Sequence, residues 1–543
     1  MRWPRLAGPA ALGLGALHTA AFAPVEAWWL QILALAGLVA LVARAASAGA
    51  GATRRAAALG VWFGLGWFAS GLWWLFISMH HYGGLAAPLA AGAVGLLALF
   101  LALYPAAALA AWARWRRGRA GQDVALFAAC WLLAELARAS FFTGFPWIAS
   151  GYAHSTGPLA AWAPWLGVYG ILAIAAAASA ALALAWRGPA DGLADRPADR
   201  LAGAGVAAQP RAGAWSRWLP LLLVSGLAAL GQGLPQAFTR STGRLAVSLV
   251  QPNIAQDLKF DAARIDANLD ALARAVEGAR GTLVVTPESV VPLPLPAVPA
   301  EYWTRLAGAV AAPGRAALVG VFLGDEQAGY VNSMIGLGAA QAGRGVAGDD
   351  FYRYGKRHLL PFGEFIPPGF GWFVRAMAIP LDDQARGQST APMRLGAQRL
   401  RPLICYEDLF GEDLADSAVG PDSATVYVNA SNLAWFGPRM VQDQHLQFSR
   451  MRALEFQRPV VRSTNTGATA VVDHHGRVSA RLPPEVAATL EAEVDGRTGD
   501  TPYARWLAAA GLQPLWALAL AVVGAMAWRP RRVPAAAGPG GGQ

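Results

Sequence analysis

Long apolar runs separated by short polar loops fill residues 1–235 and return at 505–528. The stretch between them, 240–500, has the mixed texture of a globular domain. An α-helix needs about 20 apolar residues to cross a bilayer core. The pattern therefore predicts seven spans before the globular domain and one after it, at residues 6–23, 28–42, 56–77, 85–112, 124–139, 159–186, 218–234 and 506–528.

The composition is typical of a membrane protein, because 55% of the residues are hydrophobic and only 14% are charged. The first run has no convincing small-residue cleavage site, and further spans follow it, so we expect a retained span and not a signal peptide. We divide the chain into an N-terminal membrane domain (1–238), a globular domain (240–500), a final span (505–529) and a flexible tail (530–543).

The net charge of +10 could indicate a nucleic-acid partner. Most of the arginines, however, lie in short segments between apolar runs, which indicates membrane topology. These segments are 2–5, 44–55, 114–119, 187–217 and 529–532, whereas the alternate loops at 25–26 and 80–84 contain no Lys or Arg. The positive-inside rule therefore places both termini in the cytoplasm and the globular domain on the outer side. We expect no nucleic-acid partner.

Short β-type runs alternate with helical patterns in the globular domain, as in layered α/β enzymes. We expect strands within 245–250, 281–287, 316–323, 330–339, 400–405, 424–430 and 467–473, and helices within 261–279 and 443–456. Residues 474–476 resemble a hairpin turn. No cluster has metal-ligand spacing and no Gly-rich phosphate loop opens a helix, so we expect no metal or nucleotide.

An apolar run ends at Ile404, and Cys405 follows where the chain becomes polar. A cysteine at the end of a buried strand is well placed to act as a nucleophile, although most small buried cysteines are inert core residues. The second cysteine, Cys130, lies in an apolar run far along the chain. We therefore expect no disulfide and a free thiol at Cys405.

Glu288 closes another apolar strand in TPES, and Lys356 and Glu364 follow in YGKRHLLPFGEFIP. Glu288 could be a general base for the thiol, Lys356 could stabilise an oxyanion, and Glu364 could anchor the lysine. Taken alone, each could also be an ordinary surface residue. Of 44 basic residues only Lys259 and Lys356 are lysine, which suggests that a compact ammonium is needed there.

Together these motifs resemble the Glu-Lys-Cys triad of the nitrilase superfamily. With the spans on either side, the chain is similar to the apolipoprotein N-acyltransferase family over essentially its whole length. Three further runs match that family: QPNIAQDLKF (251–260), ASNLAWFG (430–437) and RMRALEFQRPVVRSTNTGATAVVD (450–473).

The resemblance implies an α-β-β-α sandwich carried on a polytopic membrane bundle of about eight helices. It also implies ping-pong acyl transfer, with Glu288 as base, Cys405 as the nucleophile that forms a thioester, and Lys356 as an oxyanion donor. Three neighbours would support this triad: Glu364, Tyr406 through its backbone N–H, and Glu407.

The resemblance further implies a phospholipid acyl donor, a diacylated apolipoprotein acceptor and no cofactor. The protein would be a monomer in the bacterial inner membrane with its catalytic domain on the periplasmic side. Because both substrates are lipids, the apolar loops 367–381, with Phe370 and Trp372, and 290–299 could dip into the bilayer surface. Trp435 could line the acyl pocket. Packing of these residues onto their own domain is the alternative.

Two positions depart from the family pattern: Leu433 replaces a common aspartate, and Gln457 a common glycine. Three other functions stay open from the sequence: a membrane-tethered nitrilase-type amidohydrolase that passes the acyl group to water, a transporter with an outer binding domain, and Cys-His catalysis with His445. Ionisable residues are scarce in the predicted spans apart from Glu135, which disfavours transport. The strand-end position of Glu288 disfavours His445 as the base.

Overall fold

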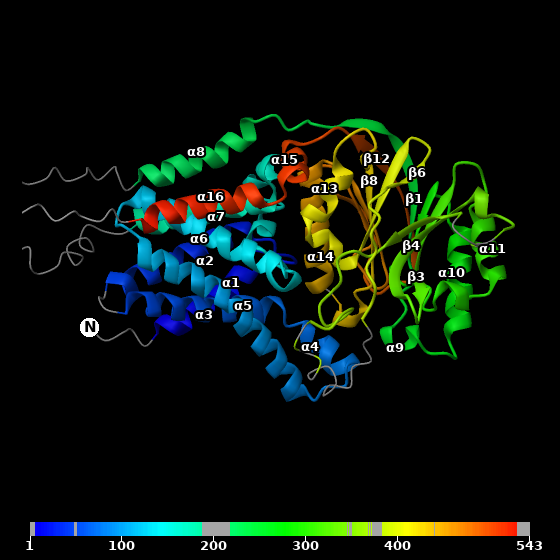
Figure 1. The fold of residues 1–543 in the computed structure, drawn as a ribbon, viewed down its shortest axis with the longest axis horizontal. Helices are drawn as coiled ribbons and strands as arrows, with labels where there is room; N and C mark the ends of the chain where they lie inside the picture. Colours follow the sequence, from blue (N-terminus) through cyan, green and yellow to red (C-terminus); the bar gives the residue numbers. More distant parts are fainter. Residues whose placement is uncertain are drawn as a thin grey trace, which may run out of the picture.

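The computed structural model contains a bundle of helices with a two-sheet domain at one end of it (Figure 1). The predicted linker 187–217, most of the loop 367–381 and the tail 530–543 lie outside the residues that it describes. The described residues are 6–47, 51–186, 218–344, 346, 350–367, 369, 371, 383–438 and 440–528.

The apolar runs form helices at the predicted places. By length and composition, four helical segments among the described residues could cross a membrane, and two bent pairs bring the number to as many as six. Helices α1 and α8, with 13 and 15 residues, are shorter than a full crossing. The bundle helices are α1 (Ala7–Thr19), α2 (Trp28–Ser47), α3 (Ala52–Gly71), α5 (Ala87–Trp115), α6 (Ala120–Ser140), α7 (Ala163–Ala185), α8 (Leu219–Gly233) and α16 (Gln513–Ala527).

Two of the predicted spans are bent. The third turns by 64° between α3 and the segment Leu75–Tyr82, which comprises α4 (Leu75–Ile77) and η1 (Ser78–Tyr82). The last predicted span divides into α15 (Pro502–Ala510) and α16, which meet at 83°. Gly511 ends α15 with a φ of 56°, a conformation that glycine adopts without steric cost.

The globular domain contains two six-stranded sheets, with the orders β12-β1-β2-β3-β4-β5 and β11-β10-β9-β8-β7-β6. The first comprises β1 (Arg240–Gln251), β2 (Leu283–Val285), β3 (Ala316–Asp325), β4 (Gly329–Gly338), β5 (Tyr352–Gly355) and β12 (Ala488–Thr498). The second comprises β6 (Met393–Leu395), β7 (Gln398–Ile404), β8 (Val426–Ser431), β9 (Val460–Thr464), β10 (Ala470–Val472) and β11 (Val478–Arg481).

All seven runs expected as strands contain strands, and residues 474–476 form the turn between the antiparallel strands β10 and β11. The pattern does not predict β5, β6, β9, β11 and β12, because these strands are short or carry too many polar residues to stand out.

Helices cover the outer face of each sheet and give the predicted α-β-β-α order of layers (Figure 1). Apolar side chains from both sheets, such as Leu318 and Val428, fill the space between them. The helices on the first sheet are α10 (Ile265–Gly278) and α11 (Ala300–Ala309), and those on the second are α13 (Ala415–Ala418), α14 (Met440–Phe456) and α15. The fold class expected from the sequence is therefore confirmed. The number of spans agrees with the expected number only approximately.

Helix α14 joins the sandwich to the bundle. It is rich in polar residues and yet mostly buried, because the second sheet covers one side and the bundle the other. Gln444 Oε1 accepts a hydrogen bond from Trp147 Nε1 at 2.7 Å, and Glu455 Oε1 accepts one from the backbone N–H of Val168 at 2.7 Å. Since buried polar groups need partners, these bonds fix how the two parts are docked.

A buried ion pair in α6 holds the bundle segment that faces the sandwich. Arg138 and Glu135 are 2% and 3% exposed, and their side chains are in direct contact. Arg138 Nη1 also donates to the backbone oxygens of Phe145 at 2.5 Å and Trp147 at 3.0 Å. The sequence pattern singles out Glu135 alone and misses its partner.

We predict that Arg138→Met will leave Glu135 as an unpaired buried carboxylate. Removing one partner of a buried ion pair costs about 3–5 kcal/mol, so the free energy of unfolding in detergent should fall by that order. The double variant Arg138→Met/Glu135→Gln should recover the part of the loss that comes from the unpaired carboxylate, but not the part that comes from the two backbone oxygens that Arg138 binds. Denaturant unfolding of the purified proteins measures both effects, and equal losses in the single and double variants would contradict this account.

Candidate active site

Glu288 follows β2 and is held by residues from both sheets. Its Oε1 accepts a hydrogen bond from Asn332 Nδ2 at 2.7 Å, and its Oε2 accepts one from the backbone N–H of Asn432 at 2.9 Å. Asn332 belongs to β4 of the first sheet, whereas Asn432 follows β8 of the second. The carboxylate is therefore fixed where the two sheets meet.

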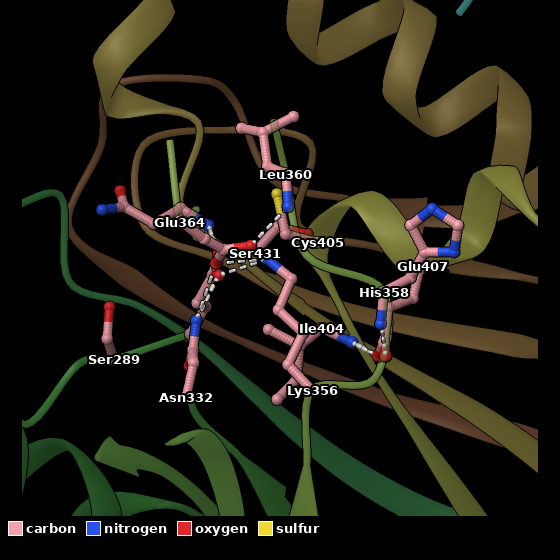
Figure 2. Close-up of polar contacts among 12 residues, drawn as sticks. Ser289, Asn332, Lys356, His358, Leu360, Glu364, Ile404, Cys405, Glu407 and Ser431 are labelled. Atoms are coloured by element: carbon pink, nitrogen blue, oxygen red, sulfur yellow. Dashed lines mark hydrogen bonds and ion pairs between the residues drawn. The ribbon is translucent and has the colours of Figure 1, made fainter. Parts of the chain in front are cut away.

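Lys356 lies directly after β5, and its ammonium sits between two carboxylates (Figure 2). Its Nζ is 3.2 Å from Glu288 Oε1 and 2.6 Å from Glu364 Oε1. Glu364 Oε2 in turn accepts a hydrogen bond from the backbone N–H of Leu360 at 2.8 Å. All three charged side chains are buried. The structure thus brings the predicted base, the predicted ammonium and the second carboxylate into direct contact.

Burial and charge oppose each other at this cluster. Burial alone would lower the pKa of Lys356, but the carboxylates of Glu288 and Glu364 outweigh it and hold that pKa well above its ordinary value. Burial raises the pKa of Glu364, and the neighbouring Lys356 ammonium opposes the rise. Lys356 therefore stays charged throughout the physiological pH range.

Cys405 follows β7 with a left-handed backbone, at a φ of 49°. Such backbone strain costs about 1–3 kcal/mol in a non-glycine residue and is concentrated at functional sites. Burial raises the pKa of the Cys405 thiol well above its ordinary value; the charge of Glu288 adds to the rise, and that of Lys356 opposes it. A thiol that stays protonated at neutral pH needs a general base before it can attack.

Glu407 connects the turn that carries Cys405 to the loop that carries Lys356. Its Oε2 accepts hydrogen bonds from the backbone N–H of Ile404 and from the Tyr354 hydroxyl, both at 2.7 Å. Its Oε1 accepts one from the backbone N–H of Arg357 at 2.7 Å. Figure 2 shows the contacts of this carboxylate with Ile404 and His358. This carboxylate is thus placed to position the two segments relative to each other.

The side chain of Tyr406 reaches the bundle. Its hydroxyl donates to the backbone oxygen of Gly144 at 3.0 Å. The adjoining His358 places its Nε2 2.9 Å from the backbone oxygen of Thr143. The bundle segment held by Arg138 therefore contacts both the turn of the cysteine and the loop of the lysine.

Of the residues expected to bind substrate, Trp435 is 39% exposed, and its ring packs edge-on against Tyr82 of the bundle with 5.7 Å between ring centroids. It follows Asn432, which binds Glu288, by three positions along the chain. Phe370 and Trp372 lie outside the described residues.

Sequence reasoning missed several residues of this site. Asn332 is a polar residue within an otherwise apolar strand, and that interruption could have indicated a role. Asn432 contributes its backbone N–H, which no sequence pattern indicates. Among the described residues, no group of three or more His, Cys, Asp or Glu is placed to hold a metal ion.

Comparison with known proteins decides the family. Residues 14–181 match the model of the apolipoprotein N-acyltransferase N-terminal domain, and residues 246–503 match that of carbon-nitrogen hydrolases. An apolipoprotein N-acyltransferase of Ralstonia nicotianae is 44% identical over 510 residues, which cover 92% of this chain and 90% of the relative. One of Verminephrobacter eiseniae is 45% identical over 506 residues, which cover 89% of each chain. This chain belongs to the apolipoprotein N-acyltransferase family.

The family assignment confirms the resemblance inferred from the motifs, and the structure explains one departure from the family pattern. Gln457, where a glycine is common, has a φ of 48°, which glycine would adopt more easily. Its side chain offsets this strain, because Oε1 accepts from the backbone N–H of Phe238 at 2.9 Å and Nε2 donates to the backbone oxygen of Gln236 at 2.6 Å. Leu433 is buried in the apolar cluster shared with the bundle.

We predict that Lys356→Met will make stability depend on pH. Burial already raises the pKa of Glu364, and without the Lys356 ammonium nothing from that lysine opposes the rise. A carboxyl group whose folded pKa is raised contributes stability that is present below its unfolded pKa, about 4.3, and is lost as the pH rises through the folded pKa. Relative to the unsubstituted protein, the variant should therefore lose more unfolding free energy at pH 8 than at pH 5, by about 2 kcal/mol.

Denaturant unfolding in detergent at the two pH values measures this difference. The double variant Lys356→Met/Glu364→Gln, which removes one of the two carboxylates, should lose most of the pH dependence. A single variant with the same stability loss at pH 5 and pH 8 would contradict the charge balance described above.

Proposed function

We propose that this protein transfers an acyl chain from a membrane phospholipid to the N-terminal amine of a diacylglyceryl-cysteine lipoprotein, through a thioester on Cys405. The observation that carries this proposal is the buried Glu288–Lys356–Glu364 cluster beside a strained strand-end cysteine, in a chain of the apolipoprotein N-acyltransferase family. The bundle supports it, because an enzyme with two lipid substrates has to work at the bilayer surface.

In the first half-reaction Glu288 takes the proton of the Cys405 thiol, and the sulfur attacks the carbonyl carbon of a phospholipid ester. The resulting oxyanion is stabilised by the Lys356 ammonium and the backbone N–H of Tyr406. When the tetrahedral intermediate collapses, the ester C–O bond breaks and Glu288 returns the proton to the leaving alkoxide. The products are a lysophospholipid and an acyl-Cys405 thioester.

In the second half-reaction the lipoprotein amine attacks the thioester carbonyl. Glu288 takes a proton from the amine, and the same oxyanion donors stabilise the second tetrahedral intermediate. The C–S bond breaks, an amide forms, and Cys405 recovers its proton from Glu288. Glu364 acts through Lys356, which it anchors, and Glu407 acts through the two segments that it connects.

We propose Trp435, Phe370 and Trp372 as contacts for the substrate chains. The support for Trp435 is its exposure and its position between Tyr82 of the bundle and the loop that binds Glu288. For Phe370 and Trp372 the support is their place in an apolar loop next in sequence to the lysine segment. Trp435→Ala should raise the phospholipid concentration needed for half-maximal acylation.

We propose that the protein lies in the bacterial inner membrane as a monomer, with residues 240–500 on the periplasmic side and both termini in the cytoplasm. The arginine distribution along residues 1–238, 505–529 and 530–543 supports this orientation. A protease added to sealed vesicles tests this orientation. It should cleave residues 240–500 only in vesicles whose periplasmic face is on the outside.

His445 is less suited than Glu288 to be the base. It is buried, and its Nδ1 lies 2.6 Å from Arg462 Nη2. Burial lowers the pKa of His445 well below its ordinary value, and the Arg462 charge adds to that effect. This histidine is thus held neutral by burial, and the Arg462 cation lies next to one of its two ring nitrogens.

We predict that the purified protein will convert a phospholipid with a tagged acyl chain and a diacylated lipopeptide into a lysophospholipid and a triacylated lipopeptide. Cys405→Ala, Glu288→Gln and Lys356→Met should each lower the rate by at least about 100-fold, the usual contribution of a base or an oxyanion donor. Mass spectrometry of the products measures the transfer. Free fatty acid as the main product, with the lipopeptide unchanged, would contradict acyl transfer and indicate an amidohydrolase-like enzyme.

A further inference from the structure

The second lysine of the chain contacts the turn that carries Glu288, whereas Lys356 contacts the Glu288 carboxylate. Lys259 is the last residue of α9 (Gln256–Lys259) and is 2% exposed. Its Nζ donates to Ser289 Oγ at 2.8 Å and to the backbone oxygen of Glu288 at 3.3 Å. The ammonium therefore binds the turn that carries the proposed base, and the mechanism given above assigns it no role.

Keeping this ammonium buried is unfavourable. Burial lowers the pKa of Lys259 to about 8, and the Glu288 charge opposes the drop only in part. The Lys259 ammonium is nevertheless mostly charged at neutral pH. The ring of Phe260 lies 5.6 Å from it. Ionisable groups that are buried against their preference are concentrated at functional sites.

Two ammonium groups therefore contact Glu288. Lys356 Nζ lies beside its carboxylate, and Lys259 Nζ binds its backbone oxygen and the hydroxyl of Ser289. Lys259 and Glu288 attract each other, because the Glu288 charge opposes the lowering of the Lys259 pKa by burial. The Cys405 thiol beside them is neutral because burial raises its pKa.

Helix α9 also contacts the loop that binds the Glu288 carboxylate. Gln256 Oε1 accepts a hydrogen bond from Asn432 Nδ2 at 2.7 Å, and the backbone N–H of Asn432 donates to Glu288 Oε2. One short helix thus holds the Glu288 turn through Lys259 and the loop that binds the Glu288 carboxylate through Gln256.

We propose that Lys259 is a positioning residue for the general base: its ammonium fixes the Glu288–Ser289 turn and places a positive charge next to the Glu288 carboxylate, beside the neutral Cys405 thiol. This inference rests on the proposed function, in which Glu288 takes the thiol proton. It gives the two lysines of the chain complementary roles, since Lys356 faces the reacting carbonyl and Lys259 acts through Glu288.

The test is the pH profile of thioester formation, followed with a phospholipid that carries a tagged acyl chain and no acceptor. Lys259→Met removes a positive charge that favours the carboxylate form of Glu288, so the acidic limb of the profile should move to higher pH by roughly one unit. Lys259→Arg keeps the charge, so the acidic limb of its pH profile should match that of the unsubstituted protein. If Lys259→Met does not fold, Lys259→Gln provides a second neutral variant.

Arg264→Met is the matched control, because it removes an exposed positive charge five residues further along the chain. Its acidic limb should not move. A Lys259→Met profile with a lower rate but an unshifted limb would show a merely structural role and overturn the proposal. If the proposed function itself is wrong, the result is different: the unsubstituted protein will form no thioester at any pH.

Discussion

A buried ammonium between two buried carboxylates is the interaction on which the rest of the site depends. Burial lowers the pKa of Lys356 and raises that of Glu364, and each of these two groups opposes the shift in the other. Each group stabilises the charged form of the other, and the surrounding amides of Asn332 and Asn432 complete their hydrogen bonds. The cluster therefore fixes a cation between two carboxyl groups, next to a thiol that burial keeps neutral.

The bundle does more than anchor this site to a membrane. The Tyr406 hydroxyl donates a hydrogen bond to one backbone oxygen of the bundle, and His358 contacts another. Helix α14 has buried polar contacts with bundle residues along much of its length. The buried Arg138 holds the bundle segment that receives two of these contacts. Geometry at the cysteine is thus coupled to packing in the helix bundle.

Much of this could be predicted from the sequence, because the strongest signals are local. Apolar runs mark the helices, and Glu288 and Cys405 both follow apolar strands, where a polar residue stands out. Contacts between distant segments could not be predicted in the same way. The bonds from Asn332 and the backbone of Asn432 to Glu288 depend on how two sheets meet, and Lys259 attracted notice through its rarity and not through any visible partner. The bends in the third and last predicted spans could not be predicted from the apolar pattern either.

In the proposed mechanism Cys405 carries the acyl group, with Glu288 as its base. The most direct test is mass spectrometry of the peptide that contains Cys405 after the protein has been incubated with a phospholipid and no acceptor. We predict that this peptide will gain the mass of the donor's acyl group, that hydroxylamine will remove it, and that the Glu288→Gln peptide will stay unmodified. An acyl group on another residue, or none at all while lipopeptide is still acylated, would contradict the account.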